Sequence, residues 1–216
     1  MTHRITDDPT LAYYEDQAAA FFAETVTVDM APLYGRFLDQ VPAGGHILDA
    51  GCGSGRDALA FHRLGYRVSA FEASPRLAEL ASAHCGLAVD VRRFQEIDWE
   101  ERFDGIWACA SLLHVPLAEL PEVFRRLARA LVPGGVLYAS FKYGNGEREQ
   151  GGRRFTDLDE PGLAALVGAV PGLVVIETWT TGDRRPGREQ ERWLNALLRT
   201  PEPAWLQRQA NRGPRS

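Results

Sequence analysis

The residues best suited to chemistry form a glycine-rich run, Leu-Asp-Ala-Gly-Cys-Gly-Ser-Gly, over residues 48–55. An apolar stretch leads into this run and a helical pattern follows it. The backbone N–H groups and the dipole of that helix N-terminus would favour an anion. Glycine lets the chain turn tightly and lets a ligand approach the backbone with no Cβ in the way. The run predicts a cofactor-binding loop, with a glycine turn that holds no ligand as the alternative.

Two carboxylates select between the cofactors that such a loop could hold. Asp49 lies at the end of the first expected strand, where it would repel a pyrophosphate but suit an ammonium group, such as that of S-adenosylmethionine. A dinucleotide fingerprint is met only loosely, from Gly53 to Ala58, and in a poor register with the strand. Glu72 ends the second expected strand and could accept both ribose hydroxyls of either cofactor. The alternatives are a helix N-cap for Asp49 and a solvated strand end for Glu72.

Three candidate reactive side chains follow the next expected strands. His114 lies in Ser-Leu-Leu-His-Val-Pro after the fourth strand, and its ordinary pKa suits a general base. Lys142 and Tyr143 end the fifth strand, where crevices open in parallel sheets. Displacement at a sulfonium needs alignment, exclusion of water and sometimes a base. A histidine bonded to the backbone at a turn is the alternative for His114.

The last third of the chain is rich in arginine. Arg153 follows a glycine-rich segment, Arg188 lies in a turn, and Trp193 lies on the strand that returns from that turn. With His114 and the Lys142–Tyr143 pair they predict a site for a small polar or anionic acceptor. Solvated turn residues that balance nearby acidic side chains are the alternative for each arginine.

Short apolar runs alternate with helical patterns in the middle of the chain, which predicts an α/β fold with a mostly parallel sheet. The fourth strand is apolar on both faces and is therefore expected at the centre. The expected strands are His46–Ala50, Arg67–Phe71, Leu87–Val91, Phe103–Ala108 and Gly135–Phe141. The expected helices between them run from the glycine loop to Leu64, over Pro75–His84 and over Leu117–Leu131.

Further elements are expected on either side of this β-α region. A helix over Asp159–Val167 precedes a hairpin of Leu173–Thr180 and Glu191–Leu198. Helical patterns over Leu11–Glu24 and Met30–Gln40 lie outside the β-α alternation and predict a lid or cap. We expect one domain over residues 1–200, with residues 1–44 as the cap, residues 45–200 as a Rossmann-like core, and residues 201–216 as a flexible tail.

Composition limits the classes of protein. The 216 residues are 45% hydrophobic and 25% charged, with a net charge of -5, which disfavours a protein that mainly holds nucleic-acid phosphates. Residues 142–216 nevertheless carry a net charge of +2, which leaves room for a local basic patch. Three scattered cysteines predict neither a disulfide framework nor a zinc site, and no metal is expected. With no apolar leader or membrane-spanning run, we expect a cytoplasmic protein without a membrane partner.

Several motifs together resemble one family. The run HILDAGCGSGRDALAF resembles the first motif of class I S-adenosylmethionine-dependent methyltransferases. Glu72, RFDGIWACASLLHVP and LARALVPGGVLYASF resemble the later motifs in order and spacing, over residues 46–141. The stretch GCGSGRDA is also similar to tellurite-resistance and thiopurine-type small-molecule methyltransferases. FKYG-x-GE and RPGRE-x-E-x-WLN resemble segments of a bacterial group of unassigned methyltransferases.

The resemblance implies a three-layer Rossmann-like fold, with a seven-stranded sheet whose last strand is antiparallel. It also implies S-adenosylmethionine as cofactor, with S-adenosylhomocysteine as product. Residues of the first motif would line the methionine end, Glu72 the ribose and Phe94 the adenine. Ala110 would offer a backbone carbonyl, and Tyr14 would close over the cofactor unless the Tyr13–Tyr14 pair is simply core. The first-motif residues are Asp49, Gly51, Gly53 and, for the methionine carboxylate, Arg56.

The sequence thus predicts a methyltransferase acting on a small polar or anionic molecule, as a monomer or homodimer. His114, Lys142 and Tyr143 are the candidate catalytic residues, and they also bind the acceptor together with Arg153, Arg188 and Trp193. The alternatives are methylation of a tRNA or nucleic-acid base, a cofactor-binding protein without transferase activity and, more distantly, a nicotinamide dehydrogenase.

Overall fold

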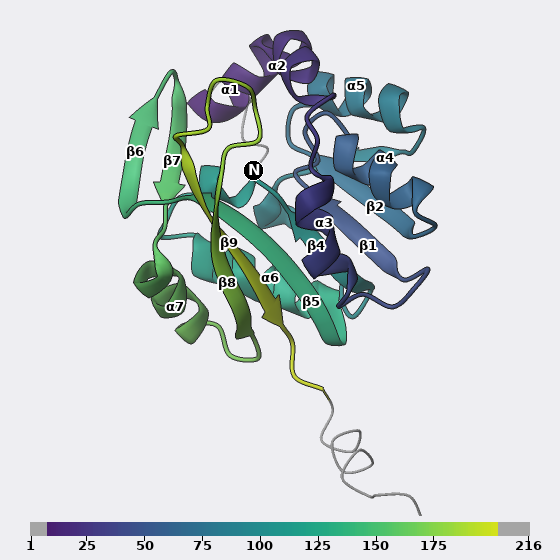
Figure 1. Ribbon diagram of the computed structural model, residues 1–216, viewed down its shortest axis with the longest axis vertical. Helices are drawn as coiled ribbons and strands as arrows, with labels where there is room; N and C mark the ends of the chain where they lie inside the picture. The colour runs from purple at the N-terminus through teal and green to yellow at the C-terminus, as the bar shows by residue number, and fades with distance from the viewer. Residues whose placement is uncertain (1–7, 203–216) are drawn as a thin grey trace, which may run out of the picture.

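The structure is a computed structural model that describes residues 8–202. Its main sheet has seven strands in the order β3-β2-β1-β4-β5-β9-β8 (Figure 1). Strands β1 to β5 pair with one another in parallel, whereas β9 is antiparallel to both β5 and β8. The α/β fold, the antiparallel last strand and the central place of β4 are therefore confirmed.

The β-α region follows the expected order closely. Short 3-10 turns, η2 and η3, follow β3 and β4. Its elements are β1 (His46–Ala50), α4 (Arg56–Arg63), β2 (Arg67–Glu72), α5 (Pro75–Cys85), β3 (Val89–Val91), η2 (Phe94–Glu96), β4 (Phe103–Ala108), η3 (Leu112–His114), α6 (Leu120–Ala130) and β5 (Leu131–Lys142). The C-terminal elements are α7 (Glu160–Gly168), β8 (Val174–Gly182) and β9 (Arg192–Arg199), which confirms the expected helix and hairpin.

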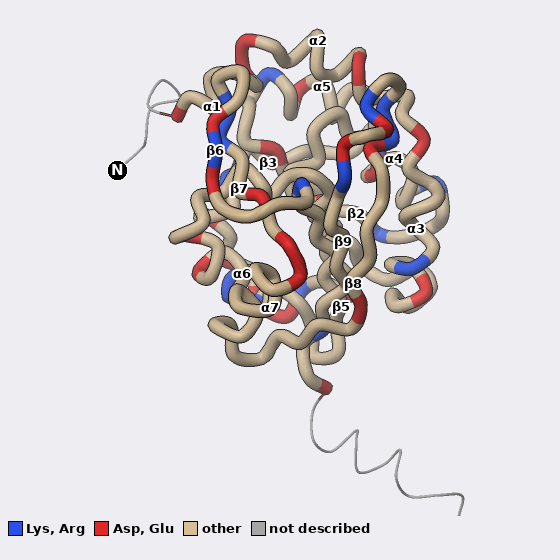
Figure 2. Tube along the Cα trace, turned by 60° about the vertical axis from the view of Figure 1, so that its left-hand side comes forward, with Lys and Arg blue, Asp and Glu red and all other residues tan. Residues whose placement is uncertain are grey.

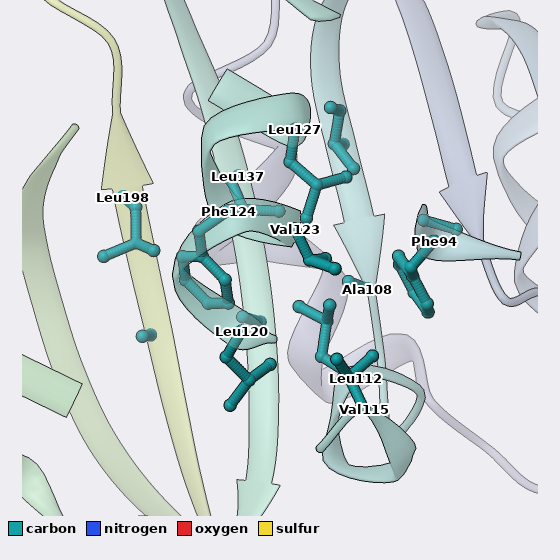
Figure 3. Packing of buried hydrophobic residues seen from close by; sticks show 14 of the residues in the cluster. Phe94, Ala108, Leu112, Val115, Leu120, Val123, Phe124, Leu127, Leu137 and Leu198 are labelled. Carbon is teal, nitrogen blue, oxygen red and sulfur yellow. The ribbon is translucent and has the colours of Figure 1, made fainter. Parts of the chain in front are cut away.

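Helices cover both faces of the sheet. On one face, α6 packs Val123, Phe124 and Leu127 against β4, β5 and β9 (Figure 3). On the other face, α3 (Ala31–Leu38) buries Phe37 against β1, β4 and β5. A Cβ on Gly105 of β4 would lie 2.8 Å from the Phe37 ring, so glycine at this position lets α3 lie close to the sheet.

The N-terminal segment differs from the single helix expected over Leu11–Glu24. It forms two helices, α1 (Pro9–Asp16) and α2 (Ala18–Thr25), separated at Gln17, whose φ of -98° and ψ of 12° are not helical. The side chain of Asp8 caps α1 by accepting from two backbone N–H groups. Both helices lie at the end of the sheet where the parallel strands finish (Figure 1).

A small second sheet was not expected. The glycine-rich segment after β5 forms an antiparallel hairpin of β6 (Gly146–Gln150) and β7 (Arg153–Asp157). Basic and acidic residues are interspersed along it (Figure 2). Tyr143 and Leu158 form an isolated bridge that joins the base of this hairpin to the chain. The expected tail lies almost entirely outside the described residues.

Candidate active site

A cavity of about 520 Å³ lies beyond the carboxyl ends of β4 and β5. Its walls come from α1, α2, η3, the β6–β7 hairpin and the turn between β8 and β9. Figure 1 shows these segments gathered at one end of the sheet. Ligands of open α/β sheets bind in this position. The topology thus brings residues from both ends of the chain around one cavity.

The glycine loop after β1 is held against β2. The backbone N–H groups of Gly51 and Cys52 both donate to the carbonyl of Phe71, at 3.0 and 2.9 Å. Gly51 has a φ of 71°, and a Cβ there would lie 2.7 Å from the Cβ of Ser111. Only glycine fits this left-handed, crowded position. The Phe21 ring of α2 also lies close to the loop, because a Cβ on Gly53 would lie 3.3 Å from it.

Glu72 is buried and accepts three backbone hydrogen bonds. One of its carboxylate oxygens accepts from Gly53 at 3.0 Å, and the other accepts from Ala73 and Ser74 at 2.8 and 3.1 Å. Burial raises the pKa of Glu72, against these hydrogen bonds, which favour the charged form. The alternative of a solvated strand-end charge is therefore wrong. Phe94 is buried beside the same loop, with its ring 5.1 Å from that of Phe71.

Asp49 is buried in the sheet with one oxygen unpaired. Its Oδ2 has no hydrogen-bond partner among the described residues. Burial and the charge of nearby Asp57 raise the pKa of Asp49 well above its ordinary value. Gly55 is the N-cap residue of α4, but a hydrogen bond from the backbone of Ala58, in the first turn of α4, favours the charged form of Asp49, so part of the capping alternative stands. Asp49 thus keeps one buried oxygen, Oδ2, for which residues 8–202 provide no donor.

Asp57, which the sequence analysis did not single out, is the opposite case. It accepts from the Tyr34 hydroxyl at 2.7 Å and from the Trp107 indole N–H at 2.9 Å. Arg56 contacts both of its oxygens, at 2.7 and 2.9 Å. Burial opposes ionisation of Asp57, but the charge of Arg56 and the hydrogen bonds from Arg56, Tyr34 and Trp107 outweigh burial and lower the pKa of Asp57. Its position inside GSGRDA was the one available signal.

The expected role of Arg56 needs correction. The sequence analysis assigned it to the methionine carboxylate, but Asp57 occupies its guanidinium with two hydrogen bonds. Arg56 still lines the cavity. Its third contact, from Nη1 to the carbonyl of Thr25 at 3.3 Å, holds the end of α2. The structure thus shows Arg56 as a buried ion-pair partner.

The loop after β4 is strained and well held. Ala110 has a φ of 52°, and its N–H donates to the Ser140 hydroxyl at 2.8 Å. The Ser111 hydroxyl donates to the carbonyl of Ala50 at 2.7 Å, which joins this loop to the end of β1. A non-glycine residue keeps a positive φ only where its surroundings enforce it. Ala110 lines the cavity, as expected of a residue near the cofactor.

Tyr14 and His114 meet over the cavity. The Tyr14 hydroxyl lies 2.7 Å from Nε2 of His114, and Nδ1 of His114 lies 2.7 Å from the carbonyl of Arg154. A carbonyl can only accept, so Nδ1 carries the proton and Nε2 accepts from Tyr14. Burial lowers the pKa of His114 to about 4 and raises that of Tyr14 to about 12. His114 is neutral in a fixed tautomer, and its turn-bonding alternative is correct for Nδ1.

Lys142 and Tyr143 lie at the end of β5, and their side chains point to different faces of the strand. Lys142 lines the cavity, pairs with Glu191, and lies 5.4 Å from the Phe155 centroid and 5.8 Å from that of Trp193. Tyr143 does not line the cavity, and its hydroxyl donates to Glu160 at 2.8 Å. Successive side chains of a strand point to opposite faces, so the two could not both face one ligand. The assignment of Tyr143 to catalysis and acceptor binding is therefore wrong.

The remaining expected acceptor residues do line the cavity. Trp193 donates its indole N–H to Asp183 at 3.1 Å. The guanidinium carbon of Arg153 lies 4.4 Å from the Tyr13 centroid and 5.2 Å from that of Phe155. Arg188 lines the cavity from the β8–β9 turn.

Comparisons with known proteins were made for the sequence and the fold. Residues 47–135 match the family described as "Methyltransferase domain". The chain is 35% identical over 106 residues to a ubiquinone biosynthesis O-methyltransferase of Xanthomonas axonopodis pv. citri (strain 306). That match covers 46% of this chain and 44% of the relative. The chain therefore spans less than half the length of the curated relatives it matches.

Two solved structures share the fold. A S-adenosylmethionine-dependent methyltransferase of Methanosarcina mazei gives a TM-score of 0.69 at 16% identity, over 79% of this chain and 99% of that one. The 1,6-didemethyltoxoflavin-N1-methyltransferase of Burkholderia thailandensis, with 1,6-didemethyltoxoflavin and S-adenosylhomocysteine bound, gives 0.70 at 24% identity, over 89% and 85%. At these identities the likeness establishes the fold. In residues 8–202, no helix is long and apolar enough to cross a membrane.

Proposed function

We propose that the chain is a class I S-adenosylmethionine-dependent methyltransferase that methylates a small polar or anionic molecule; the match of residues 47–135 to a methyltransferase domain and the shared fold support this proposal. The observation that carries the proposal is Asp49 Oδ2, a buried carboxylate oxygen near the end of β1 to which no residue between 8 and 202 donates. A buried acceptor left unpaired costs about 1–3 kcal/mol. An ammonium group on a ligand would remove that cost and add a charge-assisted hydrogen bond.

The residues around the loop fit S-adenosylmethionine, which supplies an electrophilic methyl group on a sulfonium. Asp49 would hold the methionine ammonium, and the backbone of Gly51 and Gly53 would line the methionine end. Three backbone hydrogen bonds orient the carboxylate of Glu72. A carboxylate has about four acceptor sites, so one remains for a ribose hydroxyl. Phe94 would lie against the adenine. Arg56 is left out of this set because Asp57 holds it.

Tyr14, Ala110 and His114 line the cavity, so transfer would take place beside them. The proposed cofactor residues Asp49, Gly51, Gly53, Glu72 and Phe94 do not line it. A neutral His114 with Nε2 directed at Tyr14 can take up a proton released by the acceptor, through the Tyr14 hydroxyl. The aromatic walls and the α1–α2 helices would exclude water, which displacement at a sulfonium requires.

The size of the cavity supports a small acceptor over a nucleic-acid base. A volume of about 520 Å³ is typical of small-molecule sites. The toxoflavin methyltransferase has a small molecule and S-adenosylhomocysteine bound in the same fold, and the curated relatives are named as O-methyltransferases of ubiquinone biosynthesis. These names support a small acceptor here as well.

Calorimetric titration with S-adenosylhomocysteine and with NAD tests the cofactor. We expect S-adenosylhomocysteine to bind and NAD not to bind. D49N should weaken S-adenosylhomocysteine binding about 10–100-fold, the size of a charge-assisted hydrogen bond. E79Q, at an exposed position of α5, is the matched control and should leave affinity unchanged.

Proton release gives a second readout of the same titration. An ammonium group favours the ionised form of Asp49, whose pKa is raised in the free protein. Binding of S-adenosylhomocysteine should therefore release a proton. The affinity should increase with pH until the pH exceeds the raised pKa of Asp49. Binding of NAD in preference to S-adenosylhomocysteine, or unchanged affinity in D49N, would overturn the cofactor assignment.

A further inference from the structure

The cations around the cavity are not equally satisfied. Six basic side chains line it, and four of them pair with a carboxylate. The four pairs are Lys142–Glu191, Arg56–Asp57, Arg185–Asp183 and Arg184–Asp29. Within residues 8–202, no carboxylate pairs with the other two, Arg153 and Arg188. The cavity thus keeps two positive charges without a counter-charge.

Arg153 is the better placed of the two. Its side chain leaves β7 between aromatic rings, with the guanidinium carbon 4.4 Å from the Tyr13 centroid and 5.2 Å from that of Phe155. These contacts fix the position of the guanidinium. Its Nε is buried and has no acceptor among the described residues. The guanidinium also makes a side-chain hydrogen bond with Tyr14, which leaves Nε as its unpaired N–H. Buried polar atoms are nearly always paired, so this Nε indicates an acceptor that a ligand would bring.

The anion expected here is a planar carboxylate. A guanidinium flanked by rings offers its edge, and two parallel N–H groups along that edge match the two oxygens of a carboxylate. Arg188 approaches the same cavity from the β8–β9 turn and can neutralise the anion from a second side.

The rest of the cavity suits an aromatic body. Phe21, Tyr138, Phe155 and Trp193 line it, together with Leu33 and Met30. Lys142 lies between the rings of Phe155 and Trp193 with its charge already paired to Glu191. Flat apolar walls with one unpaired cationic edge favour a ring that bears a single acidic substituent.

We propose that Arg153, supported by Arg188, forms a carboxylate-binding subsite, and that the methyl acceptor is an aromatic carboxylate. This inference rests on the proposed function and names the chemical class of its acceptor. Arg153 acts as a substrate-binding residue from the β6–β7 hairpin, outside the matched residues 47–135.

The test measures binding to the full chain saturated with S-adenosylhomocysteine. Benzoate, benzamide and cyclohexanecarboxylate are titrated by ligand-observed NMR, so that charge and aromaticity vary one at a time. We expect benzoate to bind at least 10-fold more tightly than either of the other two probes. R153M should lower benzoate affinity at least 10-fold, and R153K should recover only part of it, because an ammonium lacks the planar fork.

R154M is the matched control, because Arg154 is the next residue of β7 and its side chain pairs with Glu147 outside the cavity. It should bind all three probes as the unchanged chain does. S-adenosylhomocysteine is titrated into every variant, and thermal melts report folding. If S-adenosylhomocysteine fails to bind the unchanged chain, the proposed function is wrong.

Three results would overturn the subsite while leaving the proposed function standing. In each of them S-adenosylhomocysteine binds normally. The first is equal affinity for benzoate and benzamide, and the second is no binding of benzoate at all. The third is unchanged benzoate affinity in both R153M and R153K. Loss of S-adenosylhomocysteine affinity in R153M, in step with benzoate, would instead assign Arg153 to the cofactor and also overturn the subsite.

Discussion

Asp49 and Asp57, two buried carboxylates next to the glycine loop, have different roles because their surroundings differ. Asp57 receives a guanidinium, a phenol and an indole N–H, and its pKa is lowered despite burial. Asp49 has an unpaired oxygen, and burial beside Asp57 raises its pKa. The satisfied carboxylate stabilises the fold, whereas the unsatisfied one is available to a ligand. Residue type and spacing alone could not separate these roles, because two of the donors to Asp57, Tyr34 and Trp107, come from a distant helix and strand.

His114 gives a prediction at the residue scale. Its folded pKa of about 4 lies below the unfolded value of 6.5, so the fold favours the neutral ring. The stability that follows is fully present above pH 6.5 and is lost as the pH falls from 6.5 toward 4. Over that range the free energy of unfolding should fall by roughly 1–3 kcal/mol more in the unchanged protein than in H114Q. This range includes a reduction for solvent screening. Urea unfolding at pH 6.5 and 4.5 measures the difference.

Because other carboxyl groups titrate in the same range, the comparison between the two proteins is the informative quantity. H114Q removes the titrating ring and leaves the acidic residues in place. Equal losses of stability in both proteins would show that His114 is already accessible to protons in the folded state. In that case the buried Tyr14–His114 contact could not have the role assigned to it.

At the scale of elements, Asp57 joins three of them. Arg56 is its neighbour at the start of α4, Tyr34 comes from α3, and Trp107 comes from β4. D57N should lower the free energy of unfolding by about 3–5 kcal/mol, because it leaves Arg56 as a buried charge without its partner. Y34F removes one hydrogen bond and should cost only about 1 kcal/mol. Urea unfolding monitored by Trp fluorescence and by circular dichroism checks both values.

Equal small effects from D57N and Y34F would contradict this account. They would mean that solvent reaches Arg56 and stabilises its charge without Asp57. D39N, at an exposed position after α3, is the control for simple loss of a carboxylate and should be nearly neutral.

The sequence predicted the elements of the sheet well and the β6–β7 hairpin not at all. Apolar runs such as those of β1 and β4 have few other interpretations. Residues 142–157, by contrast, are rich in glycine and charge and lack the apolar alternation that indicates a strand. The hairpin forms because Phe155 and Leu158 pack into the core from one side of it. That tertiary contact has no local signal.

The same limit explains the errors in the site. Lys142 and Tyr143 were both assigned to the acceptor from their place at the strand end, although strand alternation allows only one of them to face it. Arg56 was assigned to the cofactor because Asp57 was not recognised as its partner. Gly51, Gly53 and Glu72 were placed together correctly, since the β-α-β order alone brings the ends of β1 and β2 side by side.

At the scale of the molecule, the N-terminal helices and the β6–β7 hairpin meet over one end of the seven-stranded sheet. Thr10 of α1 accepts from the backbone of Arg154, and Tyr14 contacts His114, so the N-terminal helices and the β6–β7 hairpin hold each other. Glu15 accepts from Ser74 at 2.6 Å and fixes α1 to the start of α5. The same helices therefore cover the glycine loop and the cavity, where the methyl donor and the methyl acceptor could meet.

The most direct measurement is a crystal structure of the complex with S-adenosylhomocysteine. The account predicts the ammonium within hydrogen-bond distance of Asp49 Oδ2, the ribose at Glu72, and the sulfur open to the cavity between Tyr14 and Ala110. A ligand bound elsewhere, or bound at the loop with Asp49 Oδ2 still unpaired and the sulfur turned away from the cavity, would contradict it.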